Sequence, residues 1–415
     1  MKVHWAHEFP GTYWIDEQEE QAVLEVLRKR SLFRYYGPTP PSAVHSFEAA
    51  AREFYGRRYA LAVNSGSGAL LTAMQAMGIG PGDEVIIPSF MWVATAAAVV
   101  HVNAIPVLCE VDDSFCMDPD DLRRKITPRT RLIVPVHMAG CPCDMASIME
   151  IAAEHKLRVL EDCAQANGAA FRGKKVGTFG DVGMFSLQLN KNMTAGEGGL
   201  LITDDEALFH KAFSAHDMSL MWQGDQPSDP PDDVLTWANG RRMSELCGAV
   251  ATVQIGKLPR IVDHMRASKR RIKEALEGTA GLAFRRLNDT DGDSGPFLIF
   301  VLEDGPSARR AAAEMKERGL HNVWRLADYG LHIYYNIKTL VQKVPLSAAG
   351  NPWNLPENAE STYDYGKGAC PTSDALFERS ILVPIPSRLS VEQEESAAAA
   401  IRAAIHSASL QGVNG

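Results

Sequence analysis

The sequence lacks any long apolar run. None approaches the roughly 18–20 apolar residues that a helix needs to cross a bilayer. The first residues, Met1 to His7, also lack the continuous apolar core of a secretory signal. Basic charge is in deficit, since 42 Lys and Arg residues face 51 Asp and Glu residues and leave a net charge of −9. We therefore expect a cytoplasmic protein that binds neither membranes nor nucleic acid.

The seven cysteines include no pair with the two-residue spacing that is typical of zinc and redox sites. The closest pair, Cys141 and Cys143, has a single residue between the thiols. We expect reduced thiols and no metal site. Internal repeats are absent as well, and 415 residues exceed a typical single core, so two domains are expected.

Short apolar runs, such as Tyr59–Val63 and Glu84–Pro88, alternate with segments of helical periodicity through the first part of the chain. This alternation predicts an α/β fold with a mostly parallel central sheet flanked by helices. We expect an N-terminal arm over residues 1–40, a large domain over residues 41–258 and a smaller C-terminal α/β domain over residues 259–415.

Three further features of the chain carry structural expectations. Pro259 is the predicted boundary, with separate helices before and after it. The polar, proline-rich segment 224–233 is predicted to be a mobile loop, and the loop-rich segment 347–371 is expected to be able to cover the site.

Polar residues follow several predicted strands. They include Ser65, Trp92, His137 and Asp162, with Gln165 close behind. Because ligands of such sheets bind beyond the carboxyl ends of the strands, we expect these residues to meet at one edge. A single strand-end His or Asp is often only a loop cap.

The stretch Gly66-Ser67-Gly68 lies between a predicted strand and a predicted helix, where free backbone N–H groups and the helix dipole favour an anion. A dinucleotide fingerprint would need a third glycine at position 71, which is Leu71, so that interpretation is rejected. Two interpretations remain, a site for a single phosphate and a plain tight turn.

An apolar run over residues 182–189 leads to Lys191, and a Gly-rich turn follows over residues 195–199. Burying an ammonium is costly, and burial lowers the pKa of a lysine and leaves the nucleophilic amine that carbonyl chemistry needs. The alternative is an exposed loop lysine.

Residues 64–70 (NSGSGAL), 161–166 (EDCAQA) and 185–199 (FSLQLNKNMTAGEGG) together resemble the DegT/DnrJ/EryC1/StrS aminotransferases. These are sugar and cyclitol aminotransferases that depend on pyridoxal phosphate and have the fold-type I (aspartate aminotransferase-like) architecture. The resemblance implies that Lys191 is the Schiff-base lysine and that Asp162 faces the pyridine nitrogen of the cofactor.

The same resemblance assigns further cofactor contacts. It implies that Gln165 lies near the phenolic oxygen of the cofactor and that Trp92 stacks on its ring. Gly66, Ser67 and Ser186 match the positions that contact the phosphate.

The resemblance further implies a homodimer with active sites at the interface. The family commonly has Asn-Tyr-Arg-Met where this chain has Gly240-Arg241-Arg242-Met243, and the family's Asn reaches the phosphate in a neighbouring subunit. Gly240 stands at the Asn position, so either Asn239 or Arg241 is left to replace it.

The implied function is transfer of an amino group from glutamate or glutamine to a keto-sugar or keto-cyclitol, with pyridoxamine phosphate as the intermediate form of the cofactor. Segments 332–336 and 368–371 favour the antibiotic-type cyclitol branch, and His137, His332 and Tyr334 are candidate substrate contacts. One alternative is a sugar dehydratase of the same fold, although those relatives have histidine in place of the lysine. Another is a non-catalytic relative that binds sugar and regulates a partner.

Overall fold

The computed structural model describes Trp5 and residues 9–410. The segment Met1 to His7, on which the expected absence of a secretory signal rests, lies outside these residues except for Trp5. In the part of the chain that is described, no helix combines the length and the apolar character needed to cross a membrane.

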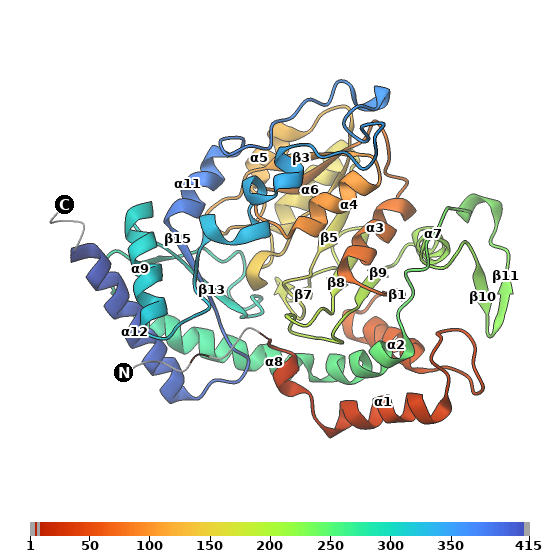
Figure 1. The fold of residues 1–415 in the computed structure, drawn as a ribbon, viewed down its shortest axis with the longest axis horizontal. Helices are drawn as coiled ribbons and strands as arrows, with labels where there is room; N and C mark the ends of the chain where they lie inside the picture. The colour runs from red at the N-terminus through yellow and green to blue at the C-terminus, as the bar shows by residue number, and fades with distance from the viewer. Residues whose placement is uncertain (1–4, 6–8, 411–415) are drawn as a thin grey trace.

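A seven-stranded sheet forms the centre of the molecule (Figure 1). Every neighbouring pair is parallel except those made by β9, which runs antiparallel to both of its neighbours. The predicted mostly parallel sheet is therefore confirmed. Its strands, in spatial order, are β1 (Tyr59–Val63), β9 (Gly199–Thr203), β8 (Val182–Ser186), β5 (Arg158–Asp162), β4 (Thr130–Ile133), β2 (Glu84–Pro88) and β3 (Ile105–Cys109).

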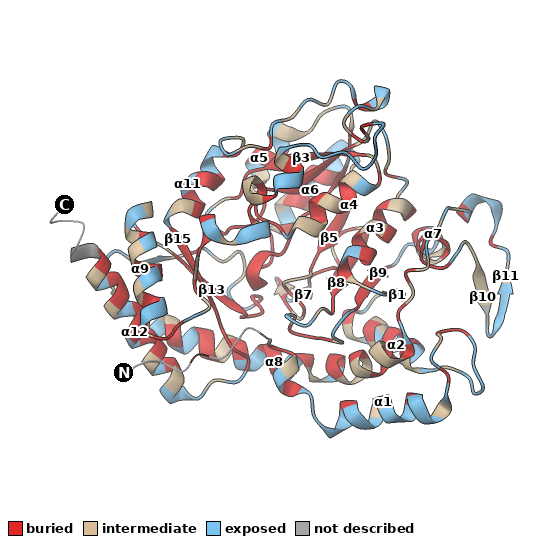
Figure 2. Cartoon of the chain, viewed as in Figure 1, coloured by how far each residue is buried: buried red, intermediate tan, exposed pale blue. Residues whose placement is uncertain are grey.

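Helices cover both faces of this sheet, and its strands are buried almost throughout (Figure 2). Alternate side chains of a strand point to opposite layers: Val85 and Ile87 pack on one side, and Ile86 packs on the other. One layer contains α3 (Gly66–Ala76), α4 (Val93–His101) and α7 (Glu206–His216). The other contains α2 (Ala43–Tyr55), α5 (Pro119–Lys125), α6 (Met145–His155) and α8 (Glu245–Leu276).

Local capping explains where several helices begin. The N-terminal helix α1 (Glu17–Lys29) starts with a capping box in which Asp16 and Glu19 exchange side-chain and backbone hydrogen bonds. Helix α5 starts with Asp118 as its cap and Pro119 at the first position, as predicted. The arm before α1 also contains the 3₁₀ turn η1 (Thr12–Trp14).

A four-stranded antiparallel sheet forms the smaller C-terminal layer. Leu298 and Phe300 pack against helices α9 (Gly305–Glu317) and α12 (Val391–Leu410) and against the end of α8. This arrangement agrees with the predicted smaller α/β unit. The strands, in spatial order, are β12 (Ala283–Phe284), β13 (Phe297–Val301), β15 (Ser380–Pro384) and β14 (Trp324–Arg325). Helix α11 (Pro371–Arg379) contacts this layer, whereas Leu340 of the short helix α10 (Lys338–Val341) packs in the core of the large sheet.

The predicted helix break at Pro259 is wrong, because α8 continues through it as one 32-residue helix. Residues on both sides of the proline, including Leu258 and Ile261, are buried in the same core, which offsets the hydrogen bond that proline cannot make. In Figure 1, α8 runs beneath both sheets from α2 towards α12. The division into two domains stays a prediction, and its proposed position lies inside this helix.

The segment 224–233 is not simply a loop. It contains strand β11 (Gln226–Ser228), which pairs with β10 (Met221–Gln223) as a hairpin. The ring of Trp222 stacks on Tyr35 at a centroid distance of 4.6 Å, and its indole N–H donates to Asp217. The prediction missed this hairpin because its anchor is an aromatic contact with a distant part of the chain.

The segment 347–371 does not cover the site. Tyr365 donates its hydroxyl to the Pro106 carbonyl at 2.7 Å, and Asn358 accepts from the backbone N–H of Gly82 at 2.7 Å. Gly82 and Pro106 lie at the amino ends of β2 and β3, whereas the site lies at the carboxyl ends. The expectation of a lid is therefore corrected.

Candidate active site

A cavity of about 400 Å³ lies at the carboxyl edge of the large sheet. The sheet brings most of the predicted site residues to its wall, since each follows or ends a strand. The predicted residues that line the cavity are Gly66, Ser67, Trp92, Asp162, Gln165, Ser186, Lys191 and His332.

One end of the cavity is formed by the first turn of α3. Ser65 caps this helix, and its hydroxyl accepts from the backbone N–H of Gly68 at 3.0 Å. Within the described residues no hydrogen bond is found for the N–H groups of Gly66 and Ser67, which occupy the first two helical positions and line the cavity. These two N–H groups and the helix dipole make this end a site for an anion.

Glycine is required at two positions of this anion site. A Cβ on Gly66 would lie 2.8 Å from Cβ of Ser186, and one on Gly199 would lie 2.2 Å from the Ser65 carbonyl oxygen. Both distances are shorter than van der Waals contact. The absence of side chains therefore lets β8 and β9 approach the turn that holds the helix N-terminus.

Asp162 ends β5 and is 3% exposed. Burial raises the pKa of its carboxyl, although hydrogen bonds from Ala164 and Thr95 and the charge of Lys191 act in the opposite direction. The backbone N–H of Ala164 donates at 3.1 Å and the Thr95 hydroxyl donates at 2.8 Å. A buried carboxylate that faces a cavity is suited to bind a protonated ring nitrogen.

Lys191 lies in the turn between β8 and β9 and is half-buried, so it is not a fully exposed loop lysine. Its backbone is fixed on both sides, because its N–H donates to the Gln188 carbonyl and its own carbonyl accepts from Gly11, both at 3.0 Å. Its charge opposes the rise that burial causes in the pKa of Asp162, and adds to the fall that burial causes in the pKa of His332. The amine is therefore electrostatically coupled to two other residues of the cavity wall.

An aromatic wall closes another side of the cavity. The ring of His332 stacks on Tyr329 with a centroid distance of 4.2 Å and an interplanar angle of 10°. The centroid of the same ring lies 4.8 Å from that of Trp92. Trp92 is still 43% exposed and lines the cavity, so a ring bound there can stack on its indole. Burial, followed by the charge of Lys191, lowers the pKa of His332 to about 3. The imidazole is therefore neutral at physiological pH.

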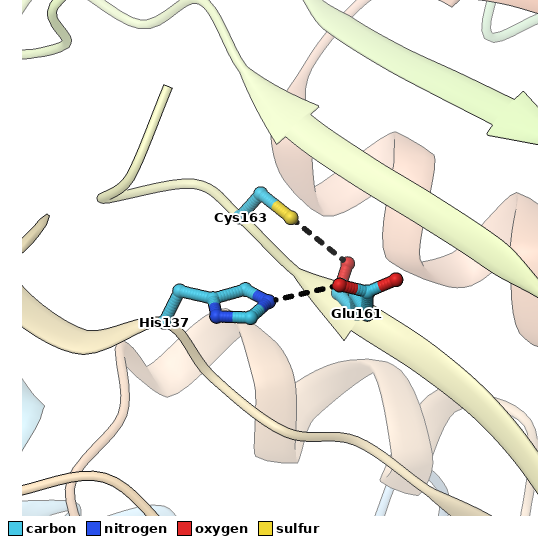
Figure 3. A group of neighbouring side chains, drawn as sticks. All are labelled: His137, Glu161 and Cys163. Atoms are coloured by element: carbon cyan, nitrogen blue, oxygen red, sulfur yellow. Dashed lines mark hydrogen bonds and ion pairs between the residues drawn. The ribbon is translucent and has the colours of Figure 1, made fainter. Parts of the chain in front are cut away.

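His137 was predicted as a substrate contact, but it does not line the cavity and is completely buried. Its Nε2 lies 3.1 Å from the Glu161 carboxylate (Figure 3). Its Nδ1 accepts from the backbone N–H of Cys143 at 3.0 Å. The prediction is corrected, because both ring nitrogens are bound inside the protein.

His137, Glu161 and Cys163 are the only group within the described residues whose ligand atoms lie close enough together to hold a metal ion (Figure 3). The carboxylate of Glu161 already accepts from His137 and from the backbone N–H groups of Gly177, Phe179 and Gly180, the last three at 2.6–2.7 Å. These donors occupy its lone-pair positions. The cluster is better suited to stabilising the end of β5 than to binding a metal.

Tyr334 also lies outside the cavity wall. Its hydroxyl donates to Asp374 at 2.9 Å and accepts from the backbone N–H of Cys370 at 3.1 Å, and the side chain is fully buried. The predicted substrate contact at Tyr334 is therefore corrected as well. Its neighbour in the sequence motif, His332, does reach the cavity.

The two candidates for the missing family Asn have different environments. The Arg241 guanidinium is turned inward and donates to Thr72 at 3.0 Å and to Gln75 at 2.7 Å, both on α3. Asn239 is exposed and does not line the cavity of its own chain. Of the two side chains, only that of Asn239 is exposed to solvent.

The sequence interpretation did not identify several residues of the cavity wall. Some of them flank Lys191, where the polar composition of the turn was the available signal. Tyr329 lies in a segment without helical or strand periodicity. Pro296 and Phe297 lie just before and at the start of β13 in the C-terminal sheet, so only the tertiary fold brings these three to the site. The residues missed around Lys191 are Gln188, Asn190, Asn192 and Glu197, with Asn167 on a neighbouring loop.

The fold is that of the fold-type I aminotransferases. The crystal structure of 3-amino-5-hydroxybenzoic acid synthase superposes with a TM-score of 0.80 and 25% identity, covering 98% of this chain and 99% of that one. The X-ray structure of DesV from S. venezuelae, in complex with a ketimine intermediate, gives a TM-score of 0.78 and 26% identity, covering 97% and 98%.

The chain belongs to the DegT/DnrJ/EryC1/StrS aminotransferase family, whose model matches residues 14–402. It is 44% identical over 211 residues to a putative L-glutamine:3-amino-2,3-dideoxy-scyllo-inosose aminotransferase of Streptoalloteichus tenebrarius, a match that covers 50% of this chain and 49% of the relative. It is 32% identical over 364 residues to the UDP-N-acetyl-3-dehydro-alpha-D-glucosamine 3-aminotransferase of Acidithiobacillus ferrooxidans, covering 87% and 88%. The chain spans about half the length of the first of these relatives and 65% of a second cyclitol aminotransferase, from Streptomyces kanamyceticus.

Proposed function

We propose that the protein is an aminotransferase that uses pyridoxal phosphate to move an amino group from glutamine or glutamate to a keto-cyclitol or keto-sugar. The observation that carries this proposal is the meeting of Lys191, Asp162 and the N-terminus of α3 in one cavity. An amine, a buried carboxylate and an anion site are the three groups that a phosphorylated pyridine aldehyde requires.

The residues of the cavity fit this cofactor. The free N–H groups of Gly66 and Ser67, together with the Ser186 hydroxyl, would hold the phosphate, and Trp92 would stack on the ring. Asp162 would face the ring nitrogen, where a positive charge would offset the cost of burying the carboxylate. When bound, the cofactor supplies an electron sink for the loss of a proton next to the transferred nitrogen.

Lys191 supplies the reactive amine of the site. An amine can bond to a carbonyl carbon, and once it is released it can carry a proton between neighbouring atoms. The backbone contacts of Lys191 with Gln188 and Gly11 would keep its reach constant through both roles. The carboxylate of Asp162 would keep the opposite end of the ring protonated throughout.

The chemistry of the cavity wall favours an acceptor rich in hydroxyl groups. Side-chain amides and a neutral imidazole, which is an acceptor as well as a donor, line the wall beside the lysine. The relatives named above act on cyclitols or nucleotide sugars, and the cyclitol relatives use L-glutamine. We therefore propose L-glutamine as the donor and a keto-cyclitol as the first acceptor to test, with aminocyclitol antibiotic biosynthesis as the setting. The residues on the wall that carry these groups are Asn167, Gln188, Asn190, Asn192 and His332.

We also propose a homodimer in which Asn239 reaches the phosphate site of the partner. Leu235 and Trp237, which precede Asn239 at alternate positions, are 55% and 93% exposed. Such exposed apolar side chains favour a contact with another chain. Arg241 is not proposed for this role, because its guanidinium is bound to α3 of its own chain.

The alternatives predict different behaviour. A dehydratase of the same fold would have histidine at position 191. This chain has lysine there, which argues against a dehydratase. A non-catalytic sugar-binding relative would not need an amine beside a buried carboxylate.

Incubation with L-glutamine or L-glutamate and a panel of keto-cyclitols and keto-sugars tests the function, with mass spectrometry of the amine product. We expect turnover with at least one acceptor and none for Lys191→Ala. Equal turnover by the wild type and by Lys191→Ala would contradict the proposal.

A further inference from the structure

A short turn, η2 (Met138–Gly140), lies between β4 and α6 beside the cavity. Ala139 in this turn has a φ of 53° and occupies the left-handed region, which is unfavourable for a residue with a Cβ. Gly140 follows with a φ of 82°. A conformation of this kind persists only when its surroundings hold it.

The C-terminal part of the chain holds this turn. The guanidinium of Arg285 donates to the Met138 carbonyl at 3.2 Å and to the Ala139 carbonyl at 2.7 Å, and Arg285 is only 4% exposed. The backbone N–H of Ser294 donates to the Gly140 carbonyl at 2.9 Å. All three carbonyls of the turn therefore accept hydrogen bonds from residues about 150 positions further along the chain.

Arg285 is itself fixed by a buried ion-pair network. Asp293 accepts from Arg285 at 3.1 Å, from the Lys269 ammonium at 2.8 Å and from the backbone N–H of Gly295 at 2.7 Å. Lys269 belongs to α8, the helix that runs beneath both sheets. The position of the guanidinium is thus set by Asp293, which the loop around Gly295 and helix α8 hold in place.

On its other side, the turn contacts a predicted cofactor residue. The backbone N–H of Ala139 donates to Oε1 of Gln165 at 3.1 Å. Because an N–H group can only donate, the oxygen of this amide must face the turn. The NH₂ group of Gln165, which lines the cavity, must then point away from the turn.

We propose that Arg285 is a positioning residue that acts through the turn 138–140 to orient Gln165, so that the Gln165 amide donates to the phenolic oxygen of bound pyridoxal phosphate. This proposal rests on the proposed function, because it requires the cofactor. Without the turn the amide could rotate and present its oxygen, which would repel a negatively charged phenolic oxygen. The C-terminal part of the chain thereby influences the electronic state of the cofactor without touching it.

The test is the pH midpoint of the absorbance change of the bound cofactor, measured without substrate. Loss of a donor at the phenolic oxygen favours the protonated cofactor, so Gln165→Leu should raise this midpoint by about one pH unit. Arg285→Lys retains the charge opposite Asp293 but not the two carbonyl contacts. It should also raise the pH midpoint, by less than Gln165→Leu does. In the Gln165→Leu background, Arg285→Lys should add no further shift.

Arg286→Lys is the matched control, because the adjacent Arg286 pairs with Asp112 and Asp113 away from the turn. The pH midpoint of the Arg286→Lys protein should equal that of the wild type. An unchanged midpoint in Arg285→Lys, or a shift that adds in full to that of Gln165→Leu, would overturn the proposal. If Arg285→Lys does not fold, Gln165→Glu tests the orientation, since a carboxylate still accepts from Ala139 but has no N–H group to donate. An unshifted midpoint in Gln165→Glu would overturn it too. Failure of the proposed function would look different, since the wild type would then show no cofactor absorbance to titrate, or would turn over no faster than Lys191→Ala.

Discussion

The hydroxyl of Thr95 donates to Oδ2 of Asp162 at 2.8 Å. Thr95 lies in the first turn of α4 and is fully buried, so the bond joins that helix to the end of β5. Burial raises the pKa of Asp162, and this hydrogen bond opposes the rise. Thr95 therefore helps to keep the carboxylate both ionised and correctly oriented.

The variant Thr95→Val tests this relationship with nearly the same shape and no hydroxyl. A hydrogen bond to a charged group contributes about 1.5–3 kcal/mol, so we expect cofactor affinity to fall at least tenfold. Equilibrium dialysis against pyridoxal phosphate measures the change. Thr95→Ser is the control and should retain most of the affinity, and a Thr95→Val protein that binds as tightly as the wild type would show that the hydroxyl has no role.

The closely packed glycines of the anion site lead to a second prediction. Gly199→Ala places a Cβ 2.2 Å from the Ser65 carbonyl oxygen, so β9 or the turn before α3 must move. We expect weaker binding of both pyridoxal phosphate and inorganic phosphate. Gly256→Ala on α8 is the control, because a Cβ there meets nothing within 4 Å. Equal phosphate affinity in the two variants would argue against the proposed phosphate site.

His332 leads to a prediction about pH. Burial and the charge of Lys191 lower its pKa from 6.5 to about 3, so the folded protein keeps this imidazole neutral while the unfolded chain protonates it below about pH 6.5. The unfolded state then binds more protons, and the contribution of His332 to stability falls as the pH drops from 6.5 towards 3. NMR of the ring should show no titration between pH 5 and 8, and His332→Gln should lose less stability than the wild type between pH 7 and 5. A ring that titrates near pH 6.5 would contradict this.

Local pattern was enough to predict much of the central sheet and the residues at its carboxyl edge. The strand at residues 84–88 and the capped helix after Asp118 depend on apolar runs and caps that the sequence displays directly. The errors have a different origin. Continuous α8, the hairpin anchored by Trp222 and the buried positions of His137 and Tyr334 depend on contacts between distant segments.

The proposed contribution of Asn239 to the partner site predicts complementation between two defective proteins. Lys191→Ala should be inactive, and Asn239→Ala should bind the cofactor more weakly. In a mixed dimer, the site with an intact lysine receives its Asn239 from the Lys191→Ala chain and is complete. Mixing the two proteins after gentle dissociation should therefore restore tight-binding sites.

Cofactor titration and activity of the mixture, compared with each parent alone, give the readout. Sedimentation of the wild type as a monomer, or a mixture that only averages its parents, would contradict the shared site.

The central claim is that Lys191 forms the covalent link to pyridoxal phosphate. Reduction of the purified protein with borohydride, followed by peptide mapping, tests it most directly. We predict a pyridoxyl group on the peptide that contains Lys191 and none in the Lys191→Ala protein. A label on a different lysine, or the absence of any label in a wild-type protein saturated with the cofactor, would contradict the account.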